Sequence, residues 1–167
     1  ATLGDRLTPH VEVMPSVFDV AVSPDGRFIA TACQDKTLRL WSVADRKEVK
    51  VLQGHTDSVI CVAYSFDGAH ILSGSRDNTA RVWDNDGRNV VVTLRGHEGA
   101  VACVAFSPNG QRCLTGSRDC TVRLWDALSG KELAAFRGHS GVVAHVAFSA
   151  DGKQFVSESL DGALKVW

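Results

Sequence analysis

The sequence lacks several features that would assign it to a specialised class of protein. No run of residues approaches the ~20 apolar positions that a membrane-spanning helix needs, and the opening ATLGDRLTPH has no apolar core like that of a secretory signal. Neither charge is in excess, because 18 Lys and Arg stand against 19 Asp and Glu, for a net charge of -1. Such a chain has no field to concentrate nucleic acid or anionic lipid. We therefore expect no nucleic-acid partner and no membrane partner.

The five cysteines show neither a disulfide nor a zinc pattern. Their number is odd and none lies in a CxxC pair. Small apolar thiols are ordinary core residues in reducing compartments. We expect free thiols in a cytoplasmic or nuclear protein, and the 44% apolar and 22% charged content is typical of a globular chain.

The chain repeats itself with a period of 42 residues. Residues 74–84 read GSRDNTARVWD, and residues 116–126 read GSRDCTVRLWD. Shifting the sequence by 42 brings four segments into register with no insertion. Their tryptophans are Trp41, Trp83, Trp125 and Trp167. Repetition at this period indicates structural units that stack on one another.

Each repeat has the pattern of four short strands. In the third repeat the strand-like segments are residues 101–106, 111–117, 121–126 and 131–136, and helical periodicity is absent. The sequences SPDG, SFDG, SPNG and SADG supply turn residues between the first two segments. The first segment is apolar on both faces, so it should be buried on both. The sequence therefore predicts a four-stranded antiparallel meander that stacks on its neighbours.

These residues resemble the WD-repeat β-propeller family over essentially the whole chain. The resemblance is carried by the GH pairs at 54–55, 96–97 and 138–139, by a turn aspartate in each repeat, and by WD at 83–84 and 125–126. It implies an all-β propeller built of four-stranded antiparallel blades, with four WD repeats of 42 residues forming one unit over residues 1–167. The repeats are expected at 13–54, 55–96, 97–138 and 139–167, the last without its outer strand.

The first repeat departs from the pattern. Val13 occupies the register position of His55, Ser42 follows Trp41, and a PH pair at 9–10 replaces GH. This departure leaves open whether the first blade has the polar network of the others.

A segment near the start is expected to form an outer strand. LTPH at 7–10 has the shape of FRGH at 136–139, so residues of about 3–8 are expected to complete a blade. Further blades from the same longer protein, a second copy of the chain, or closure of four blades on themselves would each complete the ring. Open blade faces would expose large apolar surfaces, which soluble monomers rarely tolerate.

The repeated polar residues imply structural tetrads, by resemblance to the family. Serine, histidine and aspartate also make up a nucleophilic triad, but three copies one blade apart argue against an active site. Ser73, Thr115 and Ser157 lie two residues before the serines of these sets, so the sequence leaves open which hydroxyl takes part. The expected members are His55, Ser75, Asp77 and Trp83; His97, Ser117, Asp119 and Trp125; His139, Ser159, Asp161 and Trp167.

One position of the first strand carries four potential zinc ligands. It reads Asp19, Cys61, Cys103 and His145 through the repeats. The position also suits a small side chain that points toward a neighbouring blade. We expect no metal and no cofactor, and keep a metal-binding or enzymatic role in the axial channel as the alternative function.

A cation lies two residues before each tryptophan. These residues are Arg39, Arg81, Arg123 and Lys165. They are expected to be solvated, with alkyl stems that cover apolar surface, rather than a basic stripe for phosphate. Glu158 is another departure, because Ala32, Gly74 and Gly116 occupy its register position in the other repeats.

The residues that vary on the constant framework are the candidate partner-binding positions. The residue before each turn aspartate reads Gln34, Arg76, Arg118 and Leu160, and the loops after two histidines carry Asp57 and Glu98. By resemblance, these lie on the face where partners dock. Two adjacent arginines suit an acidic or phosphorylated segment, although exposed loop charges are also common without any function. The sequence thus predicts a non-catalytic scaffold that mediates protein-protein interaction through the loop face of a β-propeller.

Overall fold

The computed structural model describes residues 15–86 and 89–167. The expected outer strand at 3–8 and the PH pair at 9–10 lie outside these ranges. The described residues form fifteen β-strands and no helix, so the predicted all-β class is confirmed. No helical segment in this part of the chain has the length and hydrophobicity of a membrane span.

The strands form four antiparallel sheets, each made from consecutive strands. The first sheet contains β1 (Val17–Val22), β2 (Phe28–Cys33), β3 (Leu38–Ser42) and β4 (Lys47–Leu52). The second contains β5 (Val59–Tyr64), β6 (His70–Ser75), β7 (Ala80–Asp84) and β8 (Val90–Leu94). The third contains β9 (Val101–Phe106), β10 (Arg112–Ser117), β11 (Val122–Asp126) and β12 (Glu132–Phe136). The fourth has three strands, β13 (Val143–Phe148), β14 (Phe155–Ser159) and β15 (Leu164–Val166).

Tight turns join the first two strands of each sheet, as the turn residues predict. In the first sheet Gly26 has a φ of +70° and donates its N–H to the carbonyl of Ser23. The Ser23 hydroxyl also donates to Asp25, 2.6 Å away. Glycine takes this left-handed conformation without a steric cost. Gly68, Gly110 and Gly152 have the same conformation at the same place in the other three sheets.

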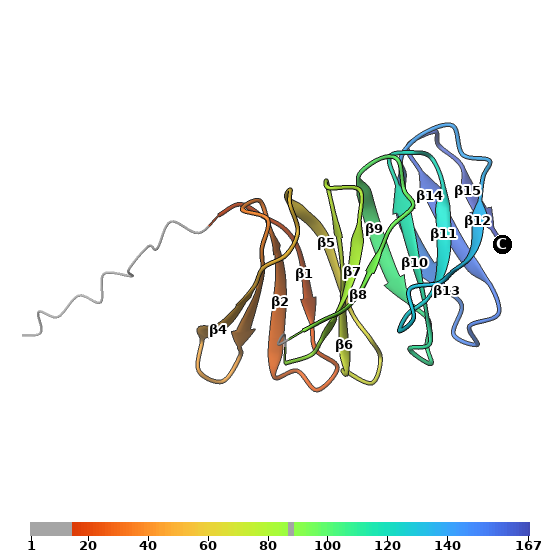
Figure 1. The fold of residues 1–167 in the computed structure, drawn as a ribbon. Coiled ribbons are helices and arrows are strands. Elements are labelled where there is room, and N and C mark those ends of the chain that lie inside the picture. Colours follow the sequence, from red (N-terminus) through yellow and green to blue (C-terminus); the bar gives the residue numbers. More distant parts are fainter. Residues whose placement is uncertain (1–14, 87–88) are drawn as a thin grey trace, which may run out of the picture.

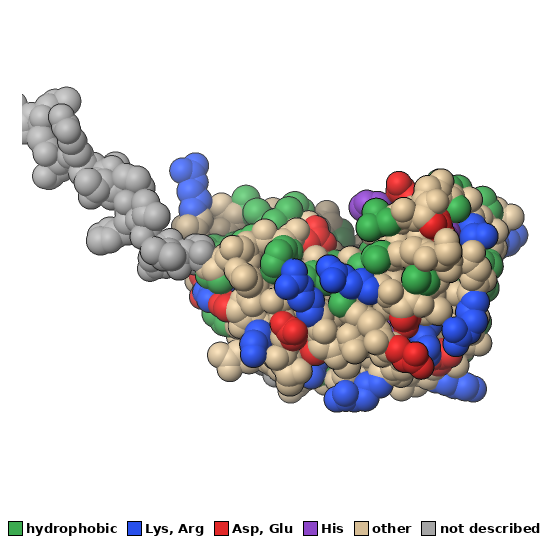
Figure 2. All heavy atoms as spheres, turned by 90° about the horizontal axis from the view of Figure 1, so that it is seen from above, with side chains coloured by type: hydrophobic (Ala, Val, Ile, Leu, Met, Phe, Trp, Pro, Cys, Tyr) green, Lys and Arg blue, Asp and Glu red, His purple; other side chains and the backbone are tan. Residues whose placement is uncertain are grey.

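The four sheets stand side by side in an open row (Figure 1). Adjacent inner strands pack together, β1 with β5, β5 with β9 and β9 with β13. The first and fourth sheets lie at opposite ends of the row. Figure 2 views the molecule from the end at which the inner strands begin. The architecture is thus that of stacked propeller blades without closure of the ring by the described residues.

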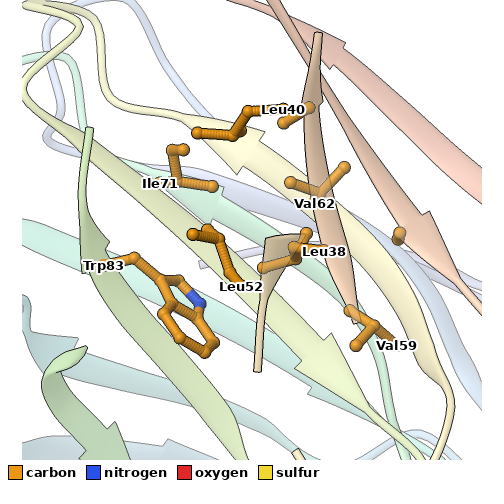
Figure 3. Packing of buried hydrophobic residues seen from close by; sticks show 9 residues of the cluster. Leu38, Leu40, Leu52, Val59, Val62, Ile71 and Trp83 are labelled. Atoms are coloured by element: carbon orange, nitrogen blue, oxygen red, sulfur yellow. The ribbon is translucent and has the colours of Figure 1, made fainter. Parts of the chain in front are cut away.

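The core lies between the sheets. In the first interface, Leu38 and Leu40 of the first sheet pack with Ile71 and Trp83 of the second, all 4% exposed or less. Figure 3 shows these side chains pointing toward one another from the two sheets. Each interface therefore joins the leucine-bearing face of one sheet to the tryptophan-bearing face of the next. Burial of this kind stabilises by about 25 cal/mol per Å² of apolar area.

Two glycines set how closely the sheets approach. A Cβ atom at Gly74 would lie 2.7 Å from Cγ1 of Val101 in the third sheet. A Cβ atom at Gly116 would lie 2.6 Å from Cγ1 of Val143 in the fourth. Contacts this short do not occur between real carbon atoms, so this position of β6 and β10 leaves space for the valine of the following sheet.

The outer faces of the first and fourth sheets are apolar and uncovered by described residues. Val20 on β1 is 58% exposed, whereas Val62, its register equivalent in the second sheet, is 6% exposed. Leu164 on β15 is 64% exposed, whereas its equivalent Val122 is fully buried. The same apolar pattern that builds the internal interfaces thus continues at both ends of the row.

Candidate functional site

A buried chain of hydrogen bonds links the turn of the second sheet to its tryptophan. His55 Nδ1 lies 2.8 Å from Asp77 Oδ2, and His55 Nε2 lies 2.8 Å from the hydroxyl of Ser73. Trp83 Nε1 donates to the same hydroxyl over 2.9 Å. Since a carboxylate only accepts, His55 donates through Nδ1, and its Nε2 accepts the Ser73 proton. The loop that leads into β5, the strand β6 and the strand β7 are thereby tied together.

The third and fourth sheets repeat this network. In the third, His97 lies 2.7 Å from both Asp119 and Thr115, and Trp125 donates to Thr115 over 2.9 Å. In the fourth, the corresponding residues are His139, Asp161, Ser157 and Trp167, with a longer His139–Asp161 distance of 3.3 Å.

The hydroxyl of each network corrects the sequence expectation. The histidine and the tryptophan of each repeat bond to Ser73, Thr115 or Ser157, and not to the expected Ser75, Ser117 or Ser159. Ser75 instead donates to the carbonyl of Asp57 and accepts from the N–H of Asp77. Ser117 does the same with Gly99 and Asp119, and Ser159 accepts from the N–H of Asp161. Each of these serines is the last residue of its strand, beside the turn. The residue two positions earlier lies deeper, where the imidazole and the indole meet.

The first sheet has a different arrangement. Trp41 still donates to a hydroxyl, that of Thr31, over 3.0 Å. The turn aspartate Asp35 instead binds the hydroxyl of Thr37 at 2.6 Å and the guanidinium of Arg39 at 2.7 Å. Val13, in the register position of His55, lies outside the described residues. The arginine thus takes the carboxylate contact that a histidine makes in the other three sheets.

Burial and hydrogen bonding perturb the titration of the networks. Burial lowers the pKa of His97, although the hydrogen bond and charge of Asp119 oppose this. Burial raises the pKa of Asp119, but hydrogen bonds from Thr121 and His97 outweigh it and bring the value down to about 2. The pKa of Asp77 is lowered in the same way by His55 and Thr79. In the third sheet, the folded state therefore holds a neutral His97 imidazole beside an ionised Asp119 carboxylate at neutral pH.

The same geometry argues against catalysis by these residues. Ser73 and Thr115 are fully buried, and the His55 side chain is 1% exposed. Each hydroxyl oxygen already accepts an indole N–H. A nucleophile must reach its substrate, and these hydroxyls are closed off from any external molecule.

The four candidate metal ligands line one cavity, but three of them are bonded to other groups. Cys61 and Cys103 direct their thiols to the carbonyls of Val101 and Val143 in the following sheets. Asp19 accepts the N–H of Val62 over 2.9 Å, and His145 is exposed. Among the described residues, no three His, Cys, Asp or Glu side chains come together in a way that could hold an ion. Burial raises the pKa of Cys61 well above its usual range and that of Cys103 to about 12, which disfavours the thiolate that a metal needs.

The cations before the tryptophans are less solvated than expected. Arg39 bonds Glu48 on β4 over 2.6 Å, and Arg123 bonds Glu132 on β12 over 2.5 Å. Their side chains are 20% and 12% exposed. The expectation of solvated residues is wrong for these two, because each side chain lies over its sheet and meets a carboxylate of the outer strand.

The candidate partner-binding residues are all exposed at one end of the sheets. The residue before each turn aspartate bonds through its N–H to the start of its own inner strand, as Arg76 does to Ser58 and Arg118 to Ala100. Turns and loops therefore share one end. Seen from this end, cationic and acidic side chains are interspersed (Figure 2). The exposed candidates are Gln34, Arg76, Arg118, Leu160, Asp57 and Glu98.

Sequence reasoning missed Phe18 at this surface. The Arg76 guanidinium lies 5.3 Å from the centre of the Phe18 ring, across the first interface. Phe18 is 43% exposed. An arginine over an aromatic face gains a cation–π contact, which orients Arg76 before any partner binds. The sequence offers no signal for this pair, because it depends on how neighbouring sheets stack.

Comparison with known proteins identifies the family of the chain and shows similarity to a transcriptional corepressor. The WD40 family model, described as WD domain, G-beta repeat, matches residues 5–42, 46–84, 88–126 and 130–167. The chain is also similar to the general transcriptional corepressor TUP1 of Saccharomyces cerevisiae, with 45% identity over 40 residues. That match covers 24% of this chain and 6% of the relative's length.

Replacing Asp119 by Ala should lower the free energy of unfolding by about 2–4 kcal/mol, because His97 loses its acceptor inside the fold. Asp35→Ala is the matched control at the same turn position of the first sheet. Its loss should be smaller, since Arg39 keeps Glu48 as a partner. Urea midpoints of both variants make the comparison, and an equal loss would contradict a special role for the histidine network.

The free energy of unfolding should also fall as the pH is lowered. The folded pKa of His97 is below the unfolded value of about 6.5, so the unfolded chain takes up a proton first as the pH drops below 6.5. For Asp119 the folded pKa is about 2 and the unfolded value about 3.9. Its contribution is therefore complete above pH 4 and lost as the pH falls toward 2. Urea unfolding at pH 7, 5 and 3 tests this, and Asp119→Ala should show a weaker dependence on pH.

Proposed function

Because the chain belongs to the WD40 repeat family, we propose that it is a non-catalytic scaffold that binds a protein partner through the exposed loop face of its sheets. The observation that carries this proposal is the contrast between a buried, repeated polar framework and exposed, variable residues beside it. Loops on a rigid scaffold commonly carry recognition. The exposed residues that vary between the repeats are therefore the ones that indicate what kind of partner binds.

The partner we propose is an acidic or phosphorylated protein segment. Arg76 and Arg118 occupy equivalent turns in neighbouring sheets and are both exposed. Arginine binds carboxylate and phosphate through paired N–H groups. The contact with Phe18 holds Arg76 in place before binding, which reduces the entropy lost on association.

The relative and the cysteines support a location in the nucleus or the cytoplasm. A stretch of 40 residues is similar to a general transcriptional corepressor, which favours the nucleus over the cytoplasm. All five cysteines are free, as is usual in a reducing compartment. We propose no membrane and no nucleic-acid partner, since the net charge is -1.

We further propose that a sheet of the same kind, from outside the described residues, covers the exposed face of the first sheet. Val20 and Val22 on this face match Val62, which is buried, and Tyr64, which is partly buried against the first sheet. A second copy would have to present its fourth sheet there. This would place Glu158 against Val17, at the position where Gly74 and Gly116 leave space for a valine. Glu158 therefore opposes head-to-tail stacking of two copies.

Reversing the charges of Arg76 and Arg118 together, with Arg76→Glu and Arg118→Glu, should reduce capture of acidic partners at least tenfold. The melting temperature should stay the same, because both side chains are exposed. Affinity capture followed by mass spectrometry gives the first result and calorimetry the second. Parallel losses of binding and melting temperature would show instead that these arginines support the fold.

Replacing Glu158 by Gly should increase self-association, because it removes the side chain that obstructs a second copy. Light scattering should then report a higher average mass for Glu158→Gly than for the unaltered chain. Glu158→Gln removes the charge but keeps the bulk, so its mass should not rise. Equal masses for all three chains would contradict the proposed role of Glu158.

A further inference from the structure

In the first and third sheets, a glutamate of the outer strand binds the arginine that lies two residues before the tryptophan. We call the place of this glutamate side chain the carboxylate position, and it is filled in these two sheets. Trp41 pairs in register with Glu48, and Trp125 pairs with Glu132. From this place each glutamate accepts a hydrogen bond from Nη1 of the arginine two residues before the tryptophan, Arg39 or Arg123. The glutamate side chains are 28% and 36% exposed. The outer-strand position opposite the tryptophan therefore brings a carboxylate within hydrogen-bond distance of the arginine, and it is partly exposed to solvent.

The second sheet has the arginine but not the carboxylate. Val90 pairs with Trp83 in the register that Glu48 and Glu132 occupy in their sheets. Arg81 forms no ion pair and its side chain no hydrogen bond within residues 15–86 and 89–167. Its Nε is buried without a partner, but so are those of Arg39 and Arg123, so Arg81 differs from the filled copies by the missing contact at Nη1. The Arg81 guanidinium lies 6.0 Å from the centre of the Trp83 ring. The Arg81 guanidinium thus lies against Gly54, and the glutamate that accepts from the equivalent arginines of the first and third sheets is absent from the second.

The surroundings of Arg81 leave its charge unbalanced. Burial lowers its pKa, Asp77 opposes this, and the exposed cation Arg95 adds to the lowering. Asp77 does not bond Arg81, because its two oxygens bind His55, Thr56 and Thr79. Arg81 is therefore a partly buried cation without an ion-pair partner among the described residues, at a place where the first and third sheets hold a carboxylate.

We propose that Arg81 binds a carboxylate supplied by an aspartate or glutamate of a partner protein. The ligand class comes from the two filled copies in this chain, where a glutamate carboxylate meets the same guanidinium position. The site lies on the flank of the second sheet and is distinct from Arg76 and Arg118. It therefore stands whether or not those two arginines bind a partner.

The test is a titration of the isotope-labelled chain, followed by NMR at low salt. The probe is an acetylated and amidated pentapeptide of alternating glycine and glutamate, and its glutamine counterpart is the neutral control. The Nε–Hε signal of Arg81, assigned with Arg81→Lys, should shift and saturate with the glutamate peptide only. Val90→Glu supplies an internal carboxylate and should weaken this binding at least tenfold.

Val49→Glu is the matched control, because it adds the same charge at an exposed position of the outer strand of the first sheet. It should leave the affinity within twofold of the unaltered chain. Equal weakening by both variants would show diffuse attraction instead of a site. Unchanged binding in Val90→Glu, or tighter binding of inorganic phosphate than of the peptide, would overturn the carboxylate assignment.

A second measurement needs no ligand. If a carboxylate at residue 90 meets Arg81, then Val90→Glu should lower the melting temperature less in the unaltered chain than in Arg81→Gln. Such a difference is the coupling that a double-mutant cycle isolates. The absence of any difference would show that a carboxylate at this position does not reach Arg81, and would overturn the proposal.

Discussion

The structure depends on the buried chain of hydrogen bonds that runs from a turn aspartate through a histidine and a hydroxyl to a tryptophan. In the second sheet it joins Asp77, His55, Ser73 and Trp83. These residues come from the turn, the preceding loop and two strands, so one network holds four segments in place. Removing any member leaves the others buried without a partner. The network consequently holds the backbone of the turn and of the preceding loop, from which the exposed side chains project.

Departures from the repeat redistribute charge instead of changing the fold. In the first sheet, Arg39 donates a hydrogen bond to the turn aspartate Asp35. In the other three sheets a histidine contacts the turn aspartate. In the second, Val90 stands where the first and third sheets have a glutamate, and Arg81 has no carboxylate partner among the described residues. The backbone pairing is the same in both cases as in the third sheet. The positions that depart from the repeat therefore change which charged side chains are paired, while the strands and their pairing stay the same.

The repeat period and the turn residues were sufficient to predict the strands and their order, because both are local properties of the sequence. The hydroxyl of each network was not predictable, since Ser73 and Ser75 lie on the same strand face and differ only in depth. Glu48 and Glu132 were missed for another reason. A register irregularity before each tryptophan shifts which outer-strand residue lies opposite it, and hydrophobic alternation alone does not reveal such a bulge. The contact of Arg76 with Phe18 required the stacking of two sheets.

The first three sheets differ in how many of their arginines are paired with a carboxylate. This difference gives a partner a basis for distinguishing one sheet from another. The first sheet has Gln34 at the turn position, and its Arg39 is neutralised by Asp35 and Glu48. The third has Arg118 at the turn, but Glu132 neutralises Arg123 on its flank. Of these three sheets, the second alone combines an exposed turn arginine, Arg76, with a flank arginine that has no carboxylate among the described residues. Under the binding roles proposed for Arg76 and Arg81, an acidic segment with two suitably spaced carboxylates would bind best across the second sheet, and the geometry of that sheet would set its orientation.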